Sequence, residues 1–199
     1  MEYNYIVIEG NIGAGKTSLA TRLANELKAK LILERFGENP FLPKFYNDPE
    51  RYSFQLEISF LVDRFNQVQD EMSTINISQP VIIADYYFSK SLIFAGITLK
   101  KDEFDIYRKV YDNFKMQFPS PDIYIYLHLP VEILLSHIRK RGREYERTIT
   151  ADYLHNIQKG YFDYFNIQKD MKILILDISK IDFVNDQKDY RIISDLNLM

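Results

Sequence analysis

A glycine-rich stretch near the N-terminus is followed directly by a lysine and a threonine. Gly10, Gly15, Lys16 and Thr17 match the pattern G-x-x-x-x-G-K-[ST] at every fixed position. In this pattern backbone N–H groups surround phosphate oxygens, the lysine reaches the β- and γ-phosphates, and the hydroxyl can bind Mg²⁺. We therefore expect ATP to be bound by Gly10, Asn11, Ile12, Gly13, Ala14, Gly15, Lys16, Thr17 and Ser18.

Two acidic residues follow short apolar segments. Glu34 comes after residues 31–33, and Asp85 comes after residues 81–84. An acid at the end of a buried strand commonly supports Mg²⁺ in nucleotide sites. We predict that Asp85 holds the cation together with Thr17, directly or through water, and the alternative is that Asp85 caps the next segment.

Short apolar segments alternate with segments of helical periodicity along the chain. Residues 5–9, 31–33, 81–85, 123–127 and 173–176 predict strands. Helices are predicted after the glycine stretch, from about residue 50, and over 102–118, 131–140 and 151–168, whereas prolines at 40, 43 and 49 predict an irregular connection. The pattern predicts one α/β domain over residues 1–199, with a five-stranded parallel sheet flanked by helices. Because ligands bind at the carboxyl ends of such strands, Glu34, Asp85 and the glycine stretch should meet at one edge.

Composition argues against several other functions. The 199 residues carry a net charge of -3, which disfavours a nucleic-acid partner. The lack of cysteine removes disulfides and thiolate metal sites and fits a reducing cytoplasm. There is no apolar run of the ~18 residues that span a bilayer, and no export signal, so we expect a cytoplasmic protein without a membrane partner.

The order of short motifs along nearly the whole chain resembles one family. Residues 8–17, 34, 39–42, 45–49, 84–87, 93–95, 141–146 and 182–183 are similar to the deoxynucleoside kinases, above all to the bacterial deoxyadenosine/deoxyguanosine kinase branch. The resemblance implies a P-loop kinase fold and transfer of the γ-phosphate of ATP to the 5'-hydroxyl of a deoxyribonucleoside in nucleotide salvage. It also implies that Glu34 is the general base and orients that hydroxyl. A surface ion pair with Arg35 or Lys30 is the alternative for Glu34.

The resemblance places further residues beside the acceptor. Phe41, Tyr46 and Glu146 fall in acceptor-side motifs, and family members use the positions of Tyr46 and Glu146 to bind the sugar 3'-hydroxyl. Two alternatives stay open. Tyr46 can be an aromatic plug in a proline-rich loop, and Glu146 can form a solvated ion pair with Arg143 or Arg147.

A basic segment with an internal glycine predicts a mobile lid over the phosphates. Guanidinium groups bind phosphate bidentately, so we expect Arg141 and Arg143 to act on the transferring group and Arg139 to bind ATP. The alternative is a solvated helix end. Asp182 and Phe183 match a family pair near the adenine of the donor, and a simple turn after the last strand is the alternative.

One position departs from the better-known animal members of the family. Tyr86 stands where those members have an arginine that organises the acceptor hydroxyl and the phosphate. Lys90 and Arg35 are candidates to supply the missing charge, and the sequence does not choose between them.

One face of the long helix carries a polar pair that flanks an aromatic residue. Glu57 and Arg64 lie seven residues apart, which places them ~20° apart around the helix and ~10 Å apart along it, with Phe60 between them. Such a face suits a flat nucleobase, and Phe94 could cover its other side. Arg64 can donate to a purine N7 or a carbonyl oxygen, and Glu57 can accept from an exocyclic amino group. We predict deoxyadenosine as the best acceptor, deoxyguanosine or deoxycytidine as weaker acceptors and thymidine as a poor one; the alternative is a solvated helix face.

Two other functions compete with this interpretation. A nucleoside monophosphate kinase needs arginines around a dianionic acceptor and no general base, whereas acids outnumber arginines between residues 30 and 60. The second alternative is a nucleotide-binding module without turnover. The apolar stripe of the long helix exceeds what one sheet face needs, and together with pairing in the family it predicts a homodimer.

Overall fold

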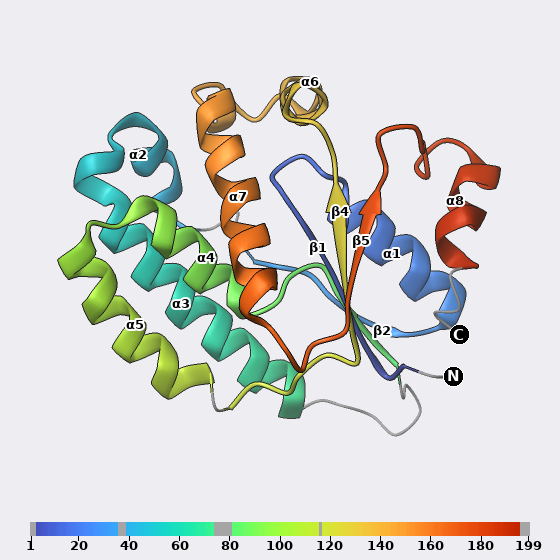
Figure 1. Ribbon diagram of the computed structural model, residues 1–199, viewed down its shortest axis with the longest axis horizontal. Helices are drawn as coiled ribbons and strands as arrows, with labels where there is room; N and C mark the ends of the chain where they lie inside the picture. Colours follow the sequence, from blue (N-terminus) through green and yellow to red (C-terminus); the bar gives the residue numbers. More distant parts are fainter. Residues whose placement is uncertain (1–2, 36–38, 74–80, 116, 196–199) are drawn as a thin grey trace.

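A parallel β-sheet organises the molecule (Figure 1). The computed structural model describes residues 3–35, 39–73, 81–115 and 117–195. The strands are β1 (Tyr5–Gly10), β2 (Lys30–Ile32), β3 (Ile82–Ala84), β4 (Ile123–His128) and β5 (Ile173–Asp177). They pair in the order β2-β3-β1-β4-β5, with every pairing parallel, which confirms the predicted five-stranded sheet.

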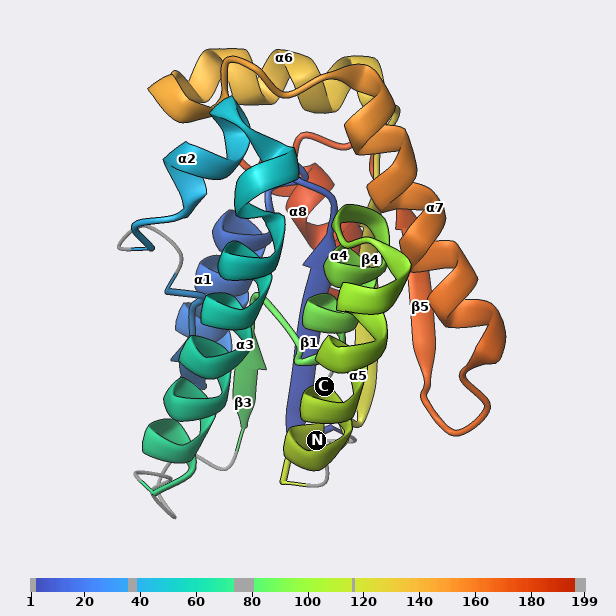
Figure 2. The same cartoon turned by 90° about the vertical axis from the view of Figure 1, so that its left-hand side faces the viewer.

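Helices cover both faces of this sheet. They are α1 (Lys16–Leu27), α2 (Leu42–Asn47), α3 (Pro49–Ser73), α4 (Ser89–Thr98), α5 (Lys101–Lys115), α6 (Val131–Arg141), α7 (Ala151–Ile167) and α8 (Gln187–Ser194), with a 3-10 turn, η1, at Glu144–Glu146. Helices α1 and α8 lie on one face, and α3, α4, α5 and α7 lie on the other (Figure 1). Helix α6 crosses the end toward which the strands point (Figure 2), so it lies above the edge where the site residues were expected.

The central strands are buried on both faces because helices cover them. Ile6, Val7 and Ile8 of β1 are fully buried, as are Tyr124 and Tyr126 of β4. This double coverage explains why the strands appear in the sequence as continuous apolar runs rather than as alternating patterns.

The apolar stripe of α3 is covered within the chain, which removes one argument for a dimer. Leu61 packs with Phe88 and Tyr107 in a buried cluster between α3, α4 and α5. Phe65 of the same helix stacks on Phe114 of α5, with ring centroids 4.2 Å apart. The excess apolar surface therefore belongs to a second helical layer, and the stripe does not by itself call for a partner.

Several predicted boundaries differ from the structure. The proline-rich connection contains α2, in which Pro43 occupies the first turn. A proline is tolerated there because an N–H at this position would have no partner within the helix. Helices α4 and α8 were not predicted, and the helix expected over 102–118 ends as α5 at Lys115. The other predicted elements are shifted by one to three residues at their ends. Within the described residues no helix is long and apolar enough to cross a membrane.

Candidate active site

The glycine stretch forms a tight loop between β1 and α1. A side chain at Gly10 would begin 2.8 Å from the carbonyl oxygen of Leu127, and Gly13 has a φ of 84°, which favours glycine. Lys16 Nζ donates to the carbonyl oxygens of Gly10 at 2.9 Å and Asn11 at 3.0 Å. Loop, lysine and helix N-terminus are thus arranged as the phosphate-binding pattern requires.

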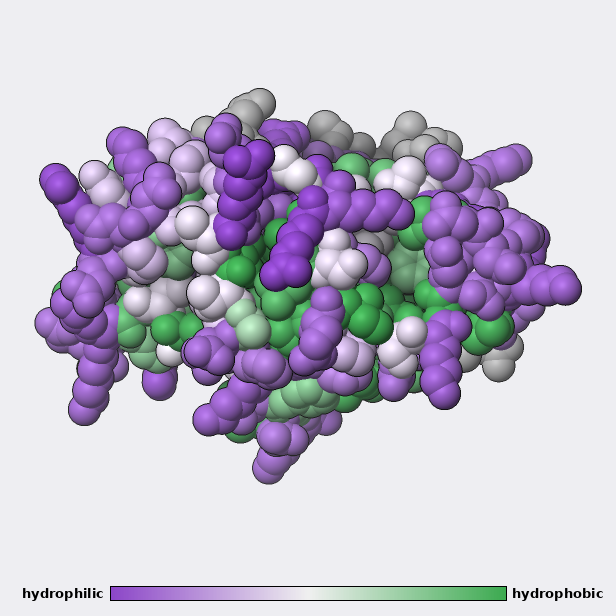
Figure 3. Space-filling view, turned by 90° about the horizontal axis from the view of Figure 1, so that it is seen from above, coloured by the Kyte–Doolittle hydropathy of each residue, from purple (hydrophilic) through white to green (hydrophobic). Residues whose placement is uncertain are grey.

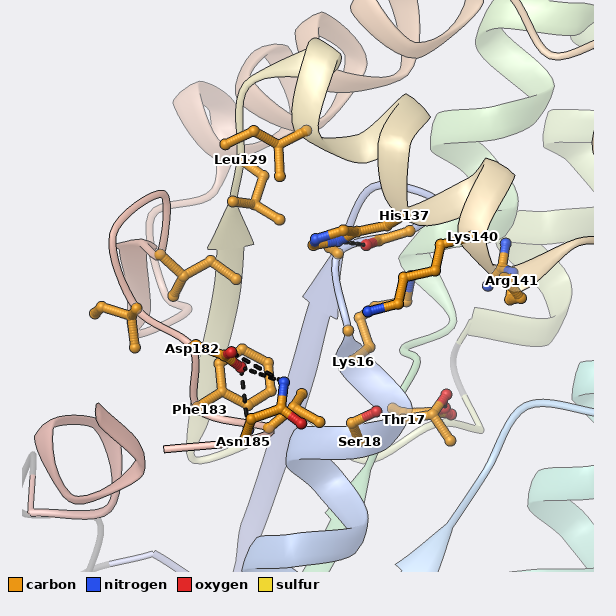
Figure 4. Close-up of a pocket in the computed structure, with 18 of the residues that line it drawn as sticks. Lys16, Thr17, Ser18, Leu129, His137, Lys140, Arg141, Asp182, Phe183 and Asn185 are labelled. Atoms are coloured by element: carbon orange, nitrogen blue, oxygen red, sulfur yellow. Dashed lines mark hydrogen bonds between the residues drawn. The ribbon is translucent and has the colours of Figure 1, made fainter. Parts of the chain in front are cut away.

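A large cavity of about 760 Å³ adjoins this loop. Its wall includes the loop, one side of α6 and the segment after β5 (Figure 4). Phe183 is buried, and its ring lies 3.0 Å from where a side chain on Gly15 would begin. Asp182 accepts hydrogen bonds from Asn185, so the predicted Asp-Phe pair does line the space beside the loop.

Helix α6 contributes different residues to this cavity from those expected. Arg139 is exposed and is not among the residues that line the cavity, whereas Lys140 and His137 are. His137 Nδ1 lies 2.9 Å from the carbonyl oxygen of Gly13, so it helps to fix the loop. Lys140 is exposed as well, but its position on the helix places it at the edge of the cavity. Figure 3, which looks down on this end, shows hydrophilic side chains extending across apolar surface.

Thr17 and Asp85 are in direct contact. Thr17 Oγ1 donates to Asp85 Oδ2 at 2.5 Å, and the backbone N–H of Glu34 donates to Asp85 Oδ1 at 2.8 Å. Hydroxyl and carboxylate oxygens are ligands that Mg²⁺ accepts, and this ion normally keeps several waters and substrate phosphate oxygens. Among the described residues no group of three His, Asp or Glu side chains could hold a metal ion. The pair therefore fits a cation that is bound chiefly through a nucleotide.

Glu34 is held between two buried cations. Arg64 donates to Glu34 Oε1 through Nε at 2.9 Å and Nη2 at 2.6 Å, and Lys90 Nζ donates to Oε2 at 2.5 Å. Burial alone would raise the pKa of Glu34, but the charges of Lys90 and Arg64 outweigh it and hold the pKa at about 2. Glu34 is therefore ionised at every physiological pH.

The two candidate cations raised by Tyr86 lie in different surroundings. Of the two candidates for the missing charge, Lys90 contacts Glu34, whereas Arg35 is largely exposed and pairs with Glu71. Arg64 was predicted to bind a nucleobase, but its Nε and Nη2 contact Glu34 and its Nη1 donates to Ser91. No sequence spacing predicts these contacts, because the residues come from separate elements.

A second cavity, of about 130 Å³, lies between α2, α3, α4 and α7. Glu57, Phe60 and Arg64 all line it, and so does Phe94 from α4, so the predicted helix face is turned into a pocket and not into solvent. The guanidinium carbon of Arg64 lies 5.0 Å from the centre of the Phe60 ring. Phe41 packs in the neighbouring apolar cluster and is not among the residues that line the cavity.

The lid residues and Glu146 form one cluster above this cavity. Arg141 donates through Nε and Nη2 to Glu146 Oε2 at 3.0 and 2.7 Å, and Arg143 lies 3.3 Å from Oε1. Glu146 is 5% exposed, whereas the side chains of Arg141 and Arg143 are 34% and 33% exposed, and Arg147 pairs with Glu144 instead. Tyr46 stacks on Tyr145 and lines the same cavity.

Glu9, which the sequence interpretation treated only as the end of a strand, lies next to the phosphate loop but lines neither cavity. Its carboxylate is fully buried and accepts hydrogen bonds from Tyr161 Oη at 2.9 Å, from the backbone of Tyr87 at 3.0 Å and from Gly10 at 3.3 Å. Burial raises its pKa above the ordinary value. An acid within an apolar run was the available signal, because such a group needs partners inside the protein.

The two cavities share part of their walls. Residues that line both are Gly13, Lys16, Thr17, Glu34, Asp85, Arg141 and Arg143. A phosphate loop that faces one cavity, with a carboxylate between it and a smaller cavity, defines a P-loop phosphotransferase that brings a nucleotide donor and a second substrate together.

Comparison with known proteins specifies the family. The model of the deoxynucleoside kinase family matches residues 6–197, and the chain belongs to this family. It is 35% identical to the deoxyguanosine kinase of Bacillus subtilis (strain 168), covering 94% of this chain and 92% of that protein. It is 33% identical to the deoxyadenosine/deoxycytidine kinase of the same organism, covering 92% and 86%. A structure of deoxyadenosine kinase from M. mycoides with dCMP and dCDP has a TM-score of 0.82 at 26% identity and covers 98% of this chain and 99% of that one.

This result confirms the predicted family, fold and ATP-dependent deoxynucleoside kinase activity. The relatives differ in the nucleoside that their names give, so they leave the preferred acceptor of this chain undecided.

Proposed function

We propose that this kinase phosphorylates deoxyribonucleosides at the 5'-hydroxyl, with deoxyadenosine favoured over deoxyguanosine and deoxycytidine, and that Glu34 positions that hydroxyl. The observation that carries the proposal is the position of Glu34, whose side chain lines both cavities and is fixed by Arg64 and Lys90. The larger cavity would take ATP, and the smaller one the nucleoside. The names of the relatives support this range of acceptors, and solved structures of the M. mycoides deoxyadenosine kinase contain dATP and dCTP.

The charge state of Glu34 defines its part in the reaction. The hydroxyl oxygen attacks the γ-phosphorus, the bond to the β-phosphate oxygen breaks, and the hydroxyl proton passes to Glu34 and then to water. A carboxylate with a pKa of about 2 is a weak base, so its main contribution is to orient the hydroxyl by accepting its hydrogen bond. Proton transfer then becomes favourable late, when the phosphoryl group has largely reached the oxygen.

Lys16, Arg141 and Arg143 complete this arrangement on the donor side. Lys16 reaches from the loop, and partial burial together with the charge of Lys90 lowers its pKa to about 8, so it stays mostly protonated at neutral pH. Exchange of the Arg141–Glu146 pair for phosphate would bring a guanidinium onto the transferring group as the lid closes. Glu146 would then be available for the sugar 3'-hydroxyl.

Thr17 and Asp85 are the residues that would hold Mg²⁺. The ion would supply charge neutralisation on the β- and γ-phosphates, and the contact between the two side chains supports this role. Replacing Asp85 with Asn should raise the Mg²⁺ concentration that gives half-maximal rate, at unchanged nucleoside KM.

The paired state of the cations argues against a nucleoside monophosphate as acceptor. Arg64 and Lys90 are bound to Glu34. Glu57 adds another acid to the same wall. A dianionic acceptor would meet carboxylates in this cavity, whereas an uncharged nucleoside would not be repelled.

The test is release of ADP from Mg-ATP in the presence of single nucleosides or single monophosphates. Purine deoxynucleosides should give turnover and monophosphates none, and the Glu34→Gln variant should lose ~10² or more in kcat with a smaller change in KM. Turnover with monophosphates alone would replace the proposal with the competing kinase, and no turnover with any acceptor would favour the binding module.

Homodimer formation and a cytoplasmic location also remain proposals. Val62 of α3 and Ile106 of α5 are exposed apolar residues on helices that pack together, and a second copy could cover them. Light scattering should then give twice the 23.7 kDa mass of the chain. The lack of cysteine supports a reducing compartment, which cell fractionation would test.

A further inference from the structure

One carboxylate oxygen in the smaller cavity lacks a partner. Glu57 is 2% exposed and lines this cavity, and its Oε1 accepts a hydrogen bond from Thr98 Oγ1 at 2.9 Å. Its Oε2 is buried and has no hydrogen-bond partner among the described residues. A buried oxygen without a partner is costly, so the cavity is built for a ligand that supplies one.

The two purines differ at the atom that such an oxygen can contact. Ring nitrogen N1 of adenine carries a lone pair and no hydrogen, whereas N1 of guanine carries a hydrogen. A protonated carboxyl donates a hydrogen bond, and an ionised one only accepts. One side chain can therefore match either base, provided that it changes its protonation state.

We propose that Glu57 Oε2 selects the purine through its proton, donating to N1 of adenine as a carboxylic acid and accepting from N1–H of guanine as a carboxylate. This proposal rests on the proposed function and specifies which acceptor is taken at which pH. The proton that separates the two states is exchanged with water, so no further reactant is needed. Neutral Glu57 would favour deoxyadenosine, and ionised Glu57 would favour deoxyguanosine.

The surroundings of Glu57 place its titration near neutrality. Burial is the largest influence and raises the pKa, Arg64 on the same helix lowers it, Thr98 and Lys90 of α4 lower it further, and Glu34 raises it. The result is a pKa of about 7. The other titratable groups that line the cavity come from the phosphate loop, the end of β3, α2, α7 and the lid, and they are Lys16, Asp85, Tyr46, Tyr153, Arg141, Arg143 and Glu146. Tyr107 of α5 does not line the cavity, but it interacts electrostatically with Glu57. Burial raises the pKa of each of these tyrosines, so all three stay neutral while Glu57 titrates.

Substitution of Thr98 offers an independent way to change the pKa of Glu57. The Thr98 hydroxyl lies 2.9 Å from Glu57 Oε1 and 3.0 Å from the carbonyl oxygen of Phe94. Donation to Glu57 stabilises the carboxylate, so Thr98→Val should raise the pKa of Glu57. Thr98 is not among the residues that line either cavity, and valine keeps the shape of the side chain.

The experiment measures kcat/KM for deoxyadenosine and for deoxyguanosine at saturating Mg-ATP, from one pH unit below to one pH unit above the pKa of about 7 of Glu57. The ratio of deoxyguanosine to deoxyadenosine cancels ionisations that affect both reactions alike. If each base requires one protonation state, this ratio rises about tenfold per pH unit. Glu57→Gln presents a fixed amide, so its ratio should not change with pH, and Thr98→Val should move the midpoints of both profiles to higher pH.

Each outcome decides one question. A wild-type ratio that stays constant across the pH range, with both nucleosides turned over, overturns the inference and leaves the kinase assignment standing. A pH-dependent ratio that persists in Glu57→Gln also overturns it, because another group must then be responsible. Absence of turnover with either nucleoside at any pH overturns the proposed function, and this inference with it.

Discussion

Replacing Lys90 with Met should weaken both the reaction and the fold, because it removes one of the two cations that hold Glu34 ionised. The Met side chain fills a similar volume without the charge. Glu34 is buried, and its pKa is about 2 against an ordinary value of 4.5. At ~1.36 kcal/mol per pKa unit, this depression corresponds to about 3 kcal/mol of stabilisation, shared between Lys90 and Arg64.

The pH dependence of this loss follows from the sign of the shift. A depressed carboxylate pKa stabilises the fold above the unfolded value, near pH 4.5, and that contribution fades as pH falls toward 2. Lys90→Met should therefore lose about half of the ~3 kcal/mol near pH 7, or about 3–6 °C in Tm for a chain of this size, and much less near pH 3. The activity of Lys90→Met should fall at acidic pH, because burial raises the pKa of Glu34 once the charge of Lys90 is removed.

Arg35→Met provides the matched control. It removes the other candidate cation, which is largely exposed and pairs with Glu71 and not with Glu34. Thermal unfolding at two pH values, with kcat profiles from the same preparations, should show a change for Lys90→Met alone. Equal losses in both variants, or a Lys90→Met enzyme with a wild-type pH profile, would refute the assigned role of the buried cations.

Four further variants test other parts of the site. Lys16→Ala should abolish transfer while unfolding remains close to wild type, measured by ADP release and by Tm. Joint replacement of Arg141 and Arg143 by Ala should lower kcat/KM at least tenfold through loss of phosphate contacts, and an unchanged rate would return both to surface roles. Glu9→Gln should raise KM for ATP through a loosened loop, with Tyr161→Phe giving a smaller effect in the same direction; if both change only Tm, the buried acid serves the fold alone.

The parts of the fold that the sequence predicted are those with local signals. The phosphate loop has fixed residues at fixed spacing, and buried parallel strands give short apolar runs. Helix α4 left no such signal. It is enclosed by α3, α5 and α7, so its residues are apolar or buried on several sides and show little periodicity. Helix α2 spans only six residues and includes a proline, which in sequence indicates a loop.

Contacts between elements were the part of the site that sequence could not supply. Arg64 was expected at a nucleobase because its helix face and its chemistry fit one, yet most of its hydrogen bonds go to Glu34 and Ser91. Which group Arg64 contacts depends on where β2 ends relative to α3, and no spacing along the chain encodes that relative position. Glu57 lines the smaller cavity, but its partner Thr98 lies on α4, an element that was not predicted.

The charge beside Glu34 comes from Lys90 and not from the position of Tyr86. Tyr86 is buried, and its hydroxyl has no partner among the described residues, so it contributes no charge to Glu34. Lys90, four residues further along the chain, reaches the same carboxylate from the first turn of α4. What the site needs is compensation of a buried negative charge, and a buried carboxylate is satisfied by any cation that reaches it with good geometry.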